Sequence, residues 1–534
     1  MKEFCVVLVA LYRNRNFPVR IMHSLLKNLE GVRVHTIFFK NSETDNTFKP
    51  HTKKEEKLFI KLINDLNPQL VGFSVLSPFF LVAKRLSNLV KDNTASSVIW
   101  GGIHPTISPE TCISEADMLC IGEGEGAIVE LIRKMQEKGD YRNINNLWLR
   151  NNGSLIKNPM RPLMENLDSL PYPSYGDDSF FFIDQNEVER VDPLLSDNCF
   201  WVQASRGCPY VCSFCVNSIL REHYKGLGNY IRKKSVDNVI NEIKLNLNLP
   251  GSKVNYVFFV DEAFGKDHAW TDEFEQKYKK EIGLPFFVET NPREINDAMI
   301  KKLTNAGLDT IGFGIQSGTD YIRNNIFQRP GKNKEIIQLI NNITQAGKKV
   351  TCELILNNPY DDVQSLKDSI EFLLQLPEPF SFTLYSLQYF PNYPLTVRAI
   401  KDNHIGLQDA SLDGLIKKAT KNWYFVPRLF PYTQKQILQN IIWLLVNNFT
   451  KKSIVRGACL EKTFYSKVLL VYLNFKAVIF GKIFAVGGLA TRSRVCSYVI
   501  RSSQYLSSGD YKGLFIKVKK RLSKNRLSKI SSQL

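Results

Sequence analysis

Two successive series of short β-rich runs, separated by segments with helical spacing, constrain the fold of this chain more than any other feature. In residues 1–140 the expected strands are 4–11, 32–39, 70–74, 97–100 and 117–121. In residues 196–400 they lie near 200–205, 254–260, 285–290, 310–315, 350–356 and 381–388. Strands that alternate with helices build parallel sheets covered by helices. The sequence therefore predicts an α/β protein in which a doubly wound, Rossmann-like (flavodoxin-like) domain precedes a partial (β/α)6 barrel of the TIM type.

The rest of the 534 residues forms a linker and a C-terminal region. Over residues 141–195 the periodicity fades and turn residues accumulate, which predicts a linker between the two domains. Over residues 401–534 the strand pattern disappears, and we expect a mainly helical, basic region. These last residues hold 24 Lys and Arg against 5 Asp and Glu, whereas residues 1–400 hold 46 against 47. Attraction to anionic partners is therefore expected of the C-terminal region alone.

Three cysteines within eight residues carry the most specific chemical signal. Cys208, Cys212 and Cys215 form a C-x3-C-x2-C pattern just after the first expected barrel strand. Three thiolates from one loop can bind three irons of a cubane cluster and leave the fourth iron open to a ligand that is not protein. The alternative is a closed zinc site, for which Cys199 and His223 could supply a fourth ligand. The spacing favours the iron–sulfur cluster.

This segment resembles the cluster-binding loop of radical S-adenosylmethionine (radical SAM) enzymes, including the aromatic Phe214 before the last cysteine. The resemblance covers roughly residues 196–400, where FFVDEAF and GFGIQSG are similar to the second-strand and fourth-strand motifs. The family usually has Glu at the position of Gln316. The resemblance implies a [4Fe–4S] cluster, reductive cleavage of SAM to a 5′-deoxyadenosyl radical, and an electron donor such as flavodoxin or ferredoxin.

Polar residues at the ends of three expected barrel strands are candidates for holding SAM. They are Asp261, Glu262, Glu289, Asn291 and Gln316. An amine and a ribose diol need carboxylate or amide acceptors, and the ends of parallel strands meet at one mouth. The alternative is that these residues only cap strands where the strands reach solvent. No residue is assigned as a catalytic acid or base.

Loops of the first series resemble the cobalamin-binding domain that precedes many radical SAM modules. The residues that carry this resemblance are Ser74, Gly101, Gly102, His104, Glu123, Gly124 and Glu125. Glycines let the backbone approach a large planar cofactor. The Asp-x-His-x-x-Gly signature is missing after the first strand, where the chain reads LYRNRNFPVR, so the resemblance implies cobalamin without a protein histidine on cobalt. A degenerate domain that kept the fold and lost the cofactor is the alternative.

Together these features predict a cobalamin-dependent radical SAM enzyme that methylates an unactivated carbon of a small molecule. A radical rearrangement or anaerobic oxidative cyclisation with the same cofactors stays open, as does the substrate. A tRNA-modifying methylthiotransferase would need a second cluster, but Cys5 and Cys120 lie inside two different expected strands. The alternative from another class is a zinc-stabilised protein that binds nucleic acid or a membrane.

A cytoplasmic location is expected, with peripheral contact to the inner face of a membrane. Ten cysteines are too few for a disulfide scaffold, and the apolar run 4–12 lacks the flanks of a secretory signal. The apolar runs 436–450 and 463–490 are too short or too often interrupted by lysine to span a bilayer. The tail 512–529 has eight basic residues and no acidic one, with the helical spacing of an interfacial helix at Phe515, Val518 and Leu522. A membrane contact of this kind could deliver a lipid-soluble substrate, and binding of the tail to nucleic acid is the less favoured alternative.

Overall fold

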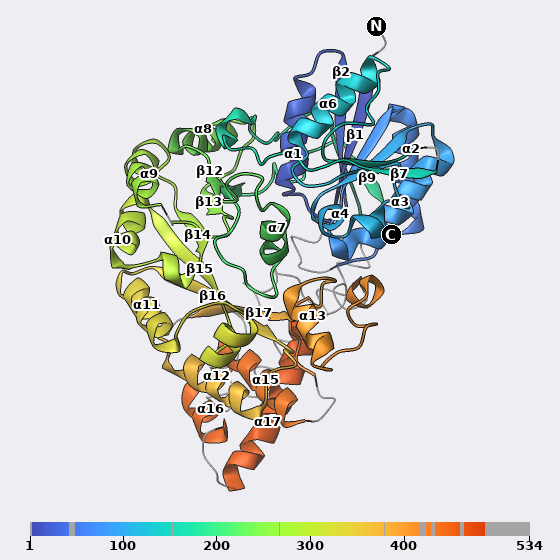
Figure 1. Cartoon of the computed structure of the whole chain (residues 1–534). Helices are drawn as coiled ribbons and strands as arrows, with labels where there is room; N and C mark the ends of the chain where they lie inside the picture. The colour runs from blue at the N-terminus through green and yellow to red at the C-terminus, as the bar shows by residue number, and fades with distance from the viewer. Residues whose placement is uncertain are drawn as a thin grey trace, which may run out of the picture.

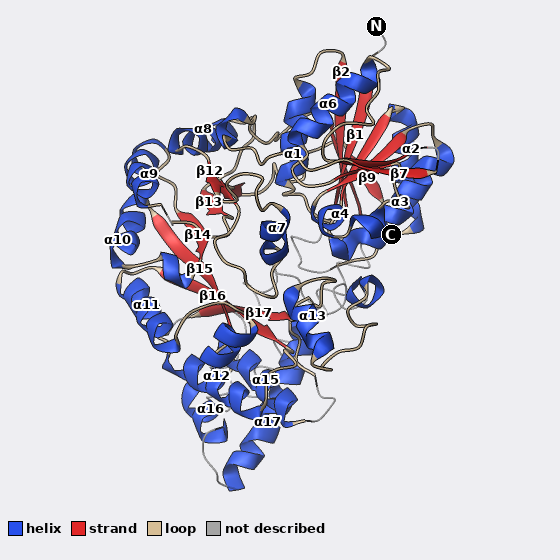
Figure 2. Ribbon diagram, in the orientation of Figure 1, coloured by secondary structure: helices blue, strands red, loops and turns tan. Residues whose placement is uncertain are grey.

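The computed structural model describes residues 3–41, 48–151, 153–265, 267–378, 380–416, 423–428, 433–459 and 464–485. Figure 1 shows an N-terminal α/β part in blue and a curved sheet in green and yellow with helices on its outer side. A group of C-terminal helices in orange and red follows beyond the last strand of that sheet. Figure 2 shows strands together with helices in the first two parts and mainly helices in the third, as the sequence predicts.

The N-terminal part is a doubly wound sheet. Its five predicted strands are confirmed and run parallel in the order β5-β4-β3-β1-β2. They are β1 Phe4–Leu11, β2 Val32–Phe39, β3 Leu70–Ser74, β4 Ser97–Gly101 and β5 Met118–Cys120. All eight residues of β1 are buried, as expected for a central strand with helices on both faces.

Helices cover both faces of this sheet. One face packs against α1 Phe17–Lys27 and α6 Glu125–Gln136, and the other against α2 Lys53–Leu66 and α3 Phe80–Asn93. Short helical turns connect the strands at the edge where the strands end. They are η1 Ser77–Phe79, α4 Ile103–Ile107 and α5 Pro109–Cys112.

The segment expected as a linker adds strands to this first sheet. A hairpin of β6 Leu147–Asn151 and β7 Ser154–Lys157 joins β5, and β8 Phe180–Asp184 pairs with β2 and with β9 Glu187–Glu189. A short turn, η2 Leu167–Ser169, lies between the two additions. The described residues therefore form a sheet of nine strands, and four of these strands come from residues 141–195.

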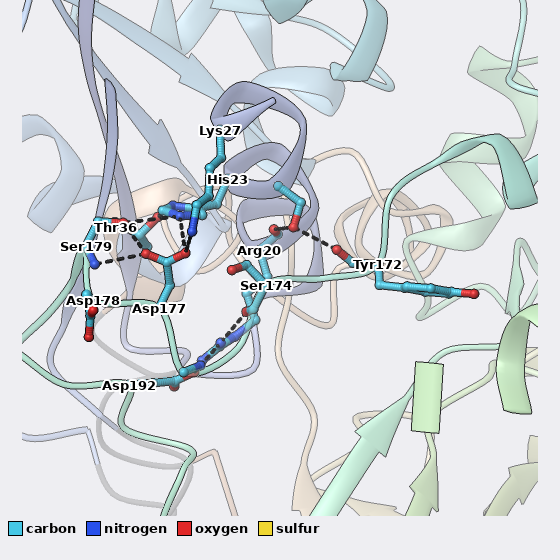
Figure 3. Close-up of polar contacts among 12 residues, drawn as sticks. Arg20, His23, Lys27, Thr36, Tyr172, Ser174, Asp177, Asp178, Ser179 and Asp192 are labelled. Carbon is cyan, nitrogen blue, oxygen red and sulfur yellow. Dashed lines mark hydrogen bonds and ion pairs between the residues drawn. The ribbon is translucent and has the colours of Figure 1, made fainter. Parts of the chain in front are cut away.

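Buried polar contacts fix the same segment to α1 (Figure 3). Arg20 donates two hydrogen bonds to Asp192, each 2.8 Å long, and neither side chain is exposed. One turn further on, Nδ1 of His23 lies 2.9 Å from Oγ1 of Thr36, and Nε2 lies 3.5 Å from Asp177. Breaking a buried ion pair by removing one partner costs about 3–5 kcal/mol. Residues 172–192 are therefore an integral part of the N-terminal fold.

The second sheet is a partial barrel of six parallel strands in sequence order. The strands are β10 Cys199–Val202, β13 Tyr256–Phe259, β14 Phe286–Thr290, β15 Leu308–Gln316, β16 Lys349–Leu356 and β17 Ser381–Ser386. The outer helices are α8 Val236–Leu247, α9 His268–Glu281, α10 Asp297–Ala306, α11 Asn333–Gln345 and α12 Val363–Gln375. The described strands confirm the predicted (β/α)6 arrangement.

Smaller elements line the end of the barrel where its strands finish. They are the two-residue ladder of β11 Ser205–Arg206 and β12 Arg232–Lys233, helix α7 Asn217–His223, and the turns η3 Pro292–Glu294 and η4 Ile322–Ile326. These segments carry the loop with the three cysteines.

Aromatic rings stack across three neighbouring strands of the barrel, β10, β13 and β14. The rings of Trp201 and Phe258 stack at 3.9 Å between centroids, and those of Phe258 and Phe287 stack at the same distance. A Cβ on Gly312 would lie 2.2 Å from the Phe287 ring, so this position has room only for glycine. Ligand sites of such barrels lie at the carboxyl ends of the strands.

The described residues of the C-terminal region are mainly helical, and Tyr424 forms an antiparallel bridge to Tyr385 of β17. Its helices are α13 Pro394–Lys401, α15 Gln434–Val446, α16 Lys452–Cys459 and α17 Phe464–Ala485. Helix α15 packs against α12 of the barrel on one side and against α17 on the other. In the part of the chain that the structure describes, no helix is long and apolar enough to cross a membrane. The predicted interfacial helix at 512–529 lies outside the described residues.

Candidate functional site

The loop with Cys208, Cys212 and Cys215 lies between β11 and α7, above the end of β10. Gly207 begins the loop with φ +89°, and a Cβ there would lie 2.1 Å from the carbonyl oxygen of Tyr230. Only glycine fits this position. Burial raises the pKa of the Cys208 thiol to about 11, so a thiolate at this position needs a bound cation such as iron.

Contacts from the far side of the barrel hold this loop. Ser213 donates its backbone N–H to the carbonyl of Phe327 at 2.9 Å and its hydroxyl to the carbonyl of Ile326 at 2.6 Å. The ring of Phe214 packs edge-on against Phe327, with centroids 5.1 Å apart. Phe214 therefore anchors the loop to η4, next to the cluster ligands and on the side away from the N-terminal domain.

The arrangement fits a cluster better than a single zinc ion. Among the described residues, no three His, Cys, Asp or Glu side chains converge on a point that could hold one ion. A cubane distributes its three thiolates over three irons and does not require such convergence. Cys199 lies at the start of β10 and His223 at the end of α7. The two extra residues of the zinc alternative therefore come from separate elements.

The two carboxylates that follow β13 have different surroundings. Asp261 is buried and accepts hydrogen bonds from the backbone N–H of Ala204, at 3.2 Å, and from the hydroxyl of Ser205. It therefore fixes the segment that leads into the cysteine loop. The Glu262 side chain is exposed to solvent at the barrel mouth. Protein atoms nevertheless surround most of its carboxyl group, and this desolvation, together with the charge of Asp261, raises the pKa of Glu262 to about 7. Of the two, Glu262 is the carboxylate that a ligand can reach.

Two amide side chains in the mouth have buried polar atoms without a partner. Gln316 sits at φ +68° and donates from Nε2 to Glu353 at 3.3 Å, while its Oε1 has no partner. Asn291 accepts from the backbone N–H of Arg293 at 3.1 Å, and its Nδ2 has no partner. Buried polar atoms are normally hydrogen-bonded. A ligand with hydroxyl and amine groups, such as SAM, would satisfy both.

Glu289 belongs to a carboxylate pair that the sequence analysis only half identified. Burial and the nearby charge of Glu353 raise the pKa of Glu289 to about 8. Glu353 lies on β16, and the hydroxyl of Tyr385 donates to it at 3.2 Å. The sequence feature that could have identified Glu353 is an acidic residue within the largely apolar strand TCELIL. Arg329, whose Nη1 lies 3.6 Å from Sγ of Cys212, is a nearby positive charge that partly offsets the rise in the pKa of Glu289.

A large pocket lies between the carboxyl ends of the first sheet and α7. It encloses about 990 Å³, including space open to solvent. Six of the seven predicted cobalamin residues line it: Ser74, Gly101, Gly102, Glu123, Gly124 and Glu125. Apolar side chains form much of the wall, and Leu220 and Tyr224 of α7 close the side toward the barrel. The size and the glycine-lined entrance fit a large planar cofactor.

His104 is the predicted residue that does not line this pocket. It is 1 % exposed, and its Nδ1 lies 2.9 Å from the hydroxyl of Ser77. Burial lowers the pKa of His104 to about 4, so the ring stays neutral at ordinary pH. His104 therefore orders the loop behind the pocket.

An ionic bridge joins the pocket to the cysteine loop. The guanidinium of Arg206, the residue before Gly207, donates to Glu123 at 3.1 Å and to Glu125 at 2.7 Å. Arg232 also donates to Glu123, at 2.8 Å. Sequence reasoning placed Glu123 and Glu125 at the pocket but missed Arg206. Two carboxylates in one loop, one of them buried, indicate that a cation lies nearby. The pocket and the cysteine loop thus share a wall.

Comparison with known proteins agrees with this geometry. Residues 202–373 match the radical SAM superfamily, and residues 5–132 match the B12 binding domain. The chain is a B12-binding radical SAM protein. Membership of this family implies a [4Fe–4S] cluster, SAM and cobalamin as cofactors.

Curated relatives of this B12-binding radical SAM protein include enzymes of different named activities. An uncharacterized methyltransferase of Pyrococcus horikoshii is 27 % identical over 49 % of this chain and 54 % of the relative. An anaerobic magnesium-protoporphyrin IX monomethyl ester cyclase of Rubrivivax gelatinosus is 23 % identical over 52 % of this chain and 49 % of the relative. The matched region spans about half the length of these relatives.

Solved structures share most of the fold. The radical SAM methyltransferase TsrM of Kitasatospora setae, with tryptophan substrate and a SAM analogue, superposes with a TM-score of 0.60 at 15 % identity. That match covers 82 % of this chain and 89 % of TsrM. OxsB with aqua-cobalamin and SAM gives a TM-score of 0.61 at 14 % identity, covering 98 % of this chain and 81 % of OxsB.

Proposed function

We propose that this protein methylates an unactivated carbon of a small molecule. When bound, the cluster and SAM supply a radical that removes hydrogen from carbon, and cobalamin supplies the methyl group. The observation that carries the proposal is the Arg206 bridge, which sets the cobalamin pocket directly against the cysteine loop. Methyl transfer to a carbon radical needs both centres to reach the same substrate atom, and a shared wall meets this need.

In this proposal, the residues of the barrel mouth bind SAM and position the cysteine loop. Glu262 accepts hydrogen bonds from the SAM amine. Gln316 accepts through Oε1 from a hydroxyl or amine group of the ligand, and Asn291 donates from Nδ2 to a hydroxyl or carboxylate oxygen of the ligand. Asp261 positions the start of the cysteine loop through Ser205.

Labelled SAM tests the proposal. The anaerobically reconstituted protein is supplied with cobalamin, a low-potential reductant, methyl-deuterated SAM and an extract of small molecules, and the products are analysed by mass spectrometry. We expect 5′-deoxyadenosine and a metabolite that gains one labelled methyl group. A protein with Cys212→Ala, prepared in parallel, should yield neither. A product that has lost two hydrogens without gaining a methyl group would refute methylation in favour of cyclisation.

Two partners belong to the same proposal. Reductive cleavage of SAM consumes one electron, which we propose comes from a flavodoxin or ferredoxin. The excess of 19 positive charges over residues 401–534 supports a peripheral position at an anionic membrane surface, where a lipid-soluble substrate would be available.

A further inference from the structure

We infer that one face of helix α17 is the surface that docks on an anionic lipid bilayer. The inference rests on the proposed membrane position and identifies the element responsible for it. The face is defined by Val471, Tyr472, Phe475 and Ile479, which are 42, 58, 49 and 55 % exposed. At about 100° per residue these four side chains fall within an arc of roughly 100° on one side of the helix. Four large apolar side chains on one stripe of a water-facing helix mark an interaction surface.

The opposite side of α17 is packed, which fixes the direction of the exposed face. Leu473, Asn474 and Ala477 are fully buried. Asn440 of α15 donates from Nδ2 to Oδ1 of Asn474 at 2.6 Å, and both side chains are buried. Helix α15 in turn packs against α12 of the barrel. The face therefore points away from the barrel. Figure 1 shows α17 at the end of the molecule remote from the N-terminal domain, so docking leaves the pocket free.

The charge around this face selects a lipid surface. Helix α17 carries three lysines and no acidic residue. Arg456 of the neighbouring α16 and Lys451, the residue before that helix, are exposed. A second copy of the chain would bring the same positive charge against this face, which opposes self-association. An anionic bilayer supplies both the opposite charge and an apolar layer. Since no described helix can span a membrane, α17 would lie in the plane of the interface.

Vesicle sedimentation with the full-length holoprotein tests the inference. The probes are vesicles of phosphatidylcholine with phosphatidylglycerol and vesicles of phosphatidylcholine alone. The double variant Phe475→Asp/Ile479→Asp should bind the anionic vesicles more than tenfold more weakly than the unmodified protein. The control Leu245→Asp/Leu407→Asp makes the same charge change at two exposed apolar positions outside α17, which are 55 and 76 % exposed. This control should bind as the unmodified protein does.

Three outcomes would overturn the inference. Unmodified protein that stays in the supernatant with anionic vesicles excludes docking. Equal binding by the α17 variant assigns the contact to another part of the chain, such as residues 486–534. A dimer of the free protein that only the α17 variant dissociates assigns the face to a second copy. Cleavage of SAM to 5′-deoxyadenosine, measured without vesicles, should be the same for all variants, so a failure of the proposed chemistry is distinguishable from a failure of docking.

Discussion

Replacing Arg206 with glutamine should loosen the wall between the cobalamin pocket and the cluster loop. The change removes hydrogen bonds of 3.1 Å to Glu123 and 2.7 Å to Glu125. Glu123 keeps Arg232 at 2.8 Å and the backbone N–H of Met164 at 3.1 Å. Glu125, whose side chain is only 6 % exposed, loses its ion-pair partner. The variant therefore leaves one buried carboxylate without compensation.

The magnitude follows from that uncompensated charge. Removing one partner of a buried ion pair costs about 3–5 kcal/mol, whereas removing both partners is often close to neutral. A cost of about 3 kcal/mol to the closed arrangement lowers its population by roughly 100-fold. We therefore expect the cobalamin Kd of Arg206→Gln to rise by at least tenfold. The double variant Arg206→Gln/Glu125→Gln should recover most of this loss.

Cobalamin titration by absorbance and thermal melting of the same samples measure these effects. The expected order of stability is the unmodified protein, then the double variant, then Arg206→Gln. The control is Arg142→Gln, which breaks a pair with Asp140 whose side chains are about half exposed. We expect no change in its melting temperature or its Kd. If the double variant is no more stable than Arg206→Gln, the reasoning from a buried, uncompensated Glu125 is wrong.

Three further predictions concern the cluster loop and the pocket. Replacing any one of Cys208, Cys212 or Cys215 with Ala should abolish 5′-deoxyadenosine formation and reduce labile sulfide, and near-normal cleavage would contradict their role as ligands. Gly207→Ala should cost about 1–3 kcal/mol from its φ of +89° alone and prevent cluster assembly, measured by iron content, because its Cβ would meet the Tyr230 carbonyl. The pKa of about 4 for His104, against about 6.5 when unfolded, means that stability falls as the pH drops below 6.5. By pH 5 the loss attributable to His104 is about 2 kcal/mol, so His104→Gln should melt with a smaller pH dependence, and an unchanged dependence would refute this origin.

The sequence was informative wherever the burial pattern is strong. Each predicted strand of the first series is present, because a parallel strand between two helical layers is apolar along its whole length. The strands at 147–157 and 180–189 were not predicted individually. Residues Glu187–Glu189 are all exposed, so their sequence lacks the alternation of apolar and polar residues that identifies a strand. The hairpin at 147–157 pairs with β5, and β8 pairs with β2; a local sequence pattern does not reveal these partners.

The candidate site shows the same division. From residue type and position at strand ends, the sequence predicted that Ser74 and Glu123 lie at the pocket and that Glu262 lies at the barrel mouth. What the sequence left undecided was the direction of each side chain. The side chain of His104 points into the core and contacts the hydroxyl of Ser77. The carboxylate of Asp261 accepts a hydrogen bond from the hydroxyl of Ser205. Both outcomes depend on partners far away in the chain, which spacing alone does not identify.

The contacts of Arg20 decide where the N-terminal domain can be separated from the rest of the protein. A fragment that ends at residue 140 would retain a fully buried guanidinium but lose Asp192, its carboxylate partner. It would also expose the hydrogen-bonding edge of β2, now covered by β8, as a template for aggregation. A fragment that ends near residue 195 keeps both features. Cobalamin binding by the isolated domain should therefore be measured on the longer piece, since insolubility of the shorter one would report on its bare edge and give no information about the pocket.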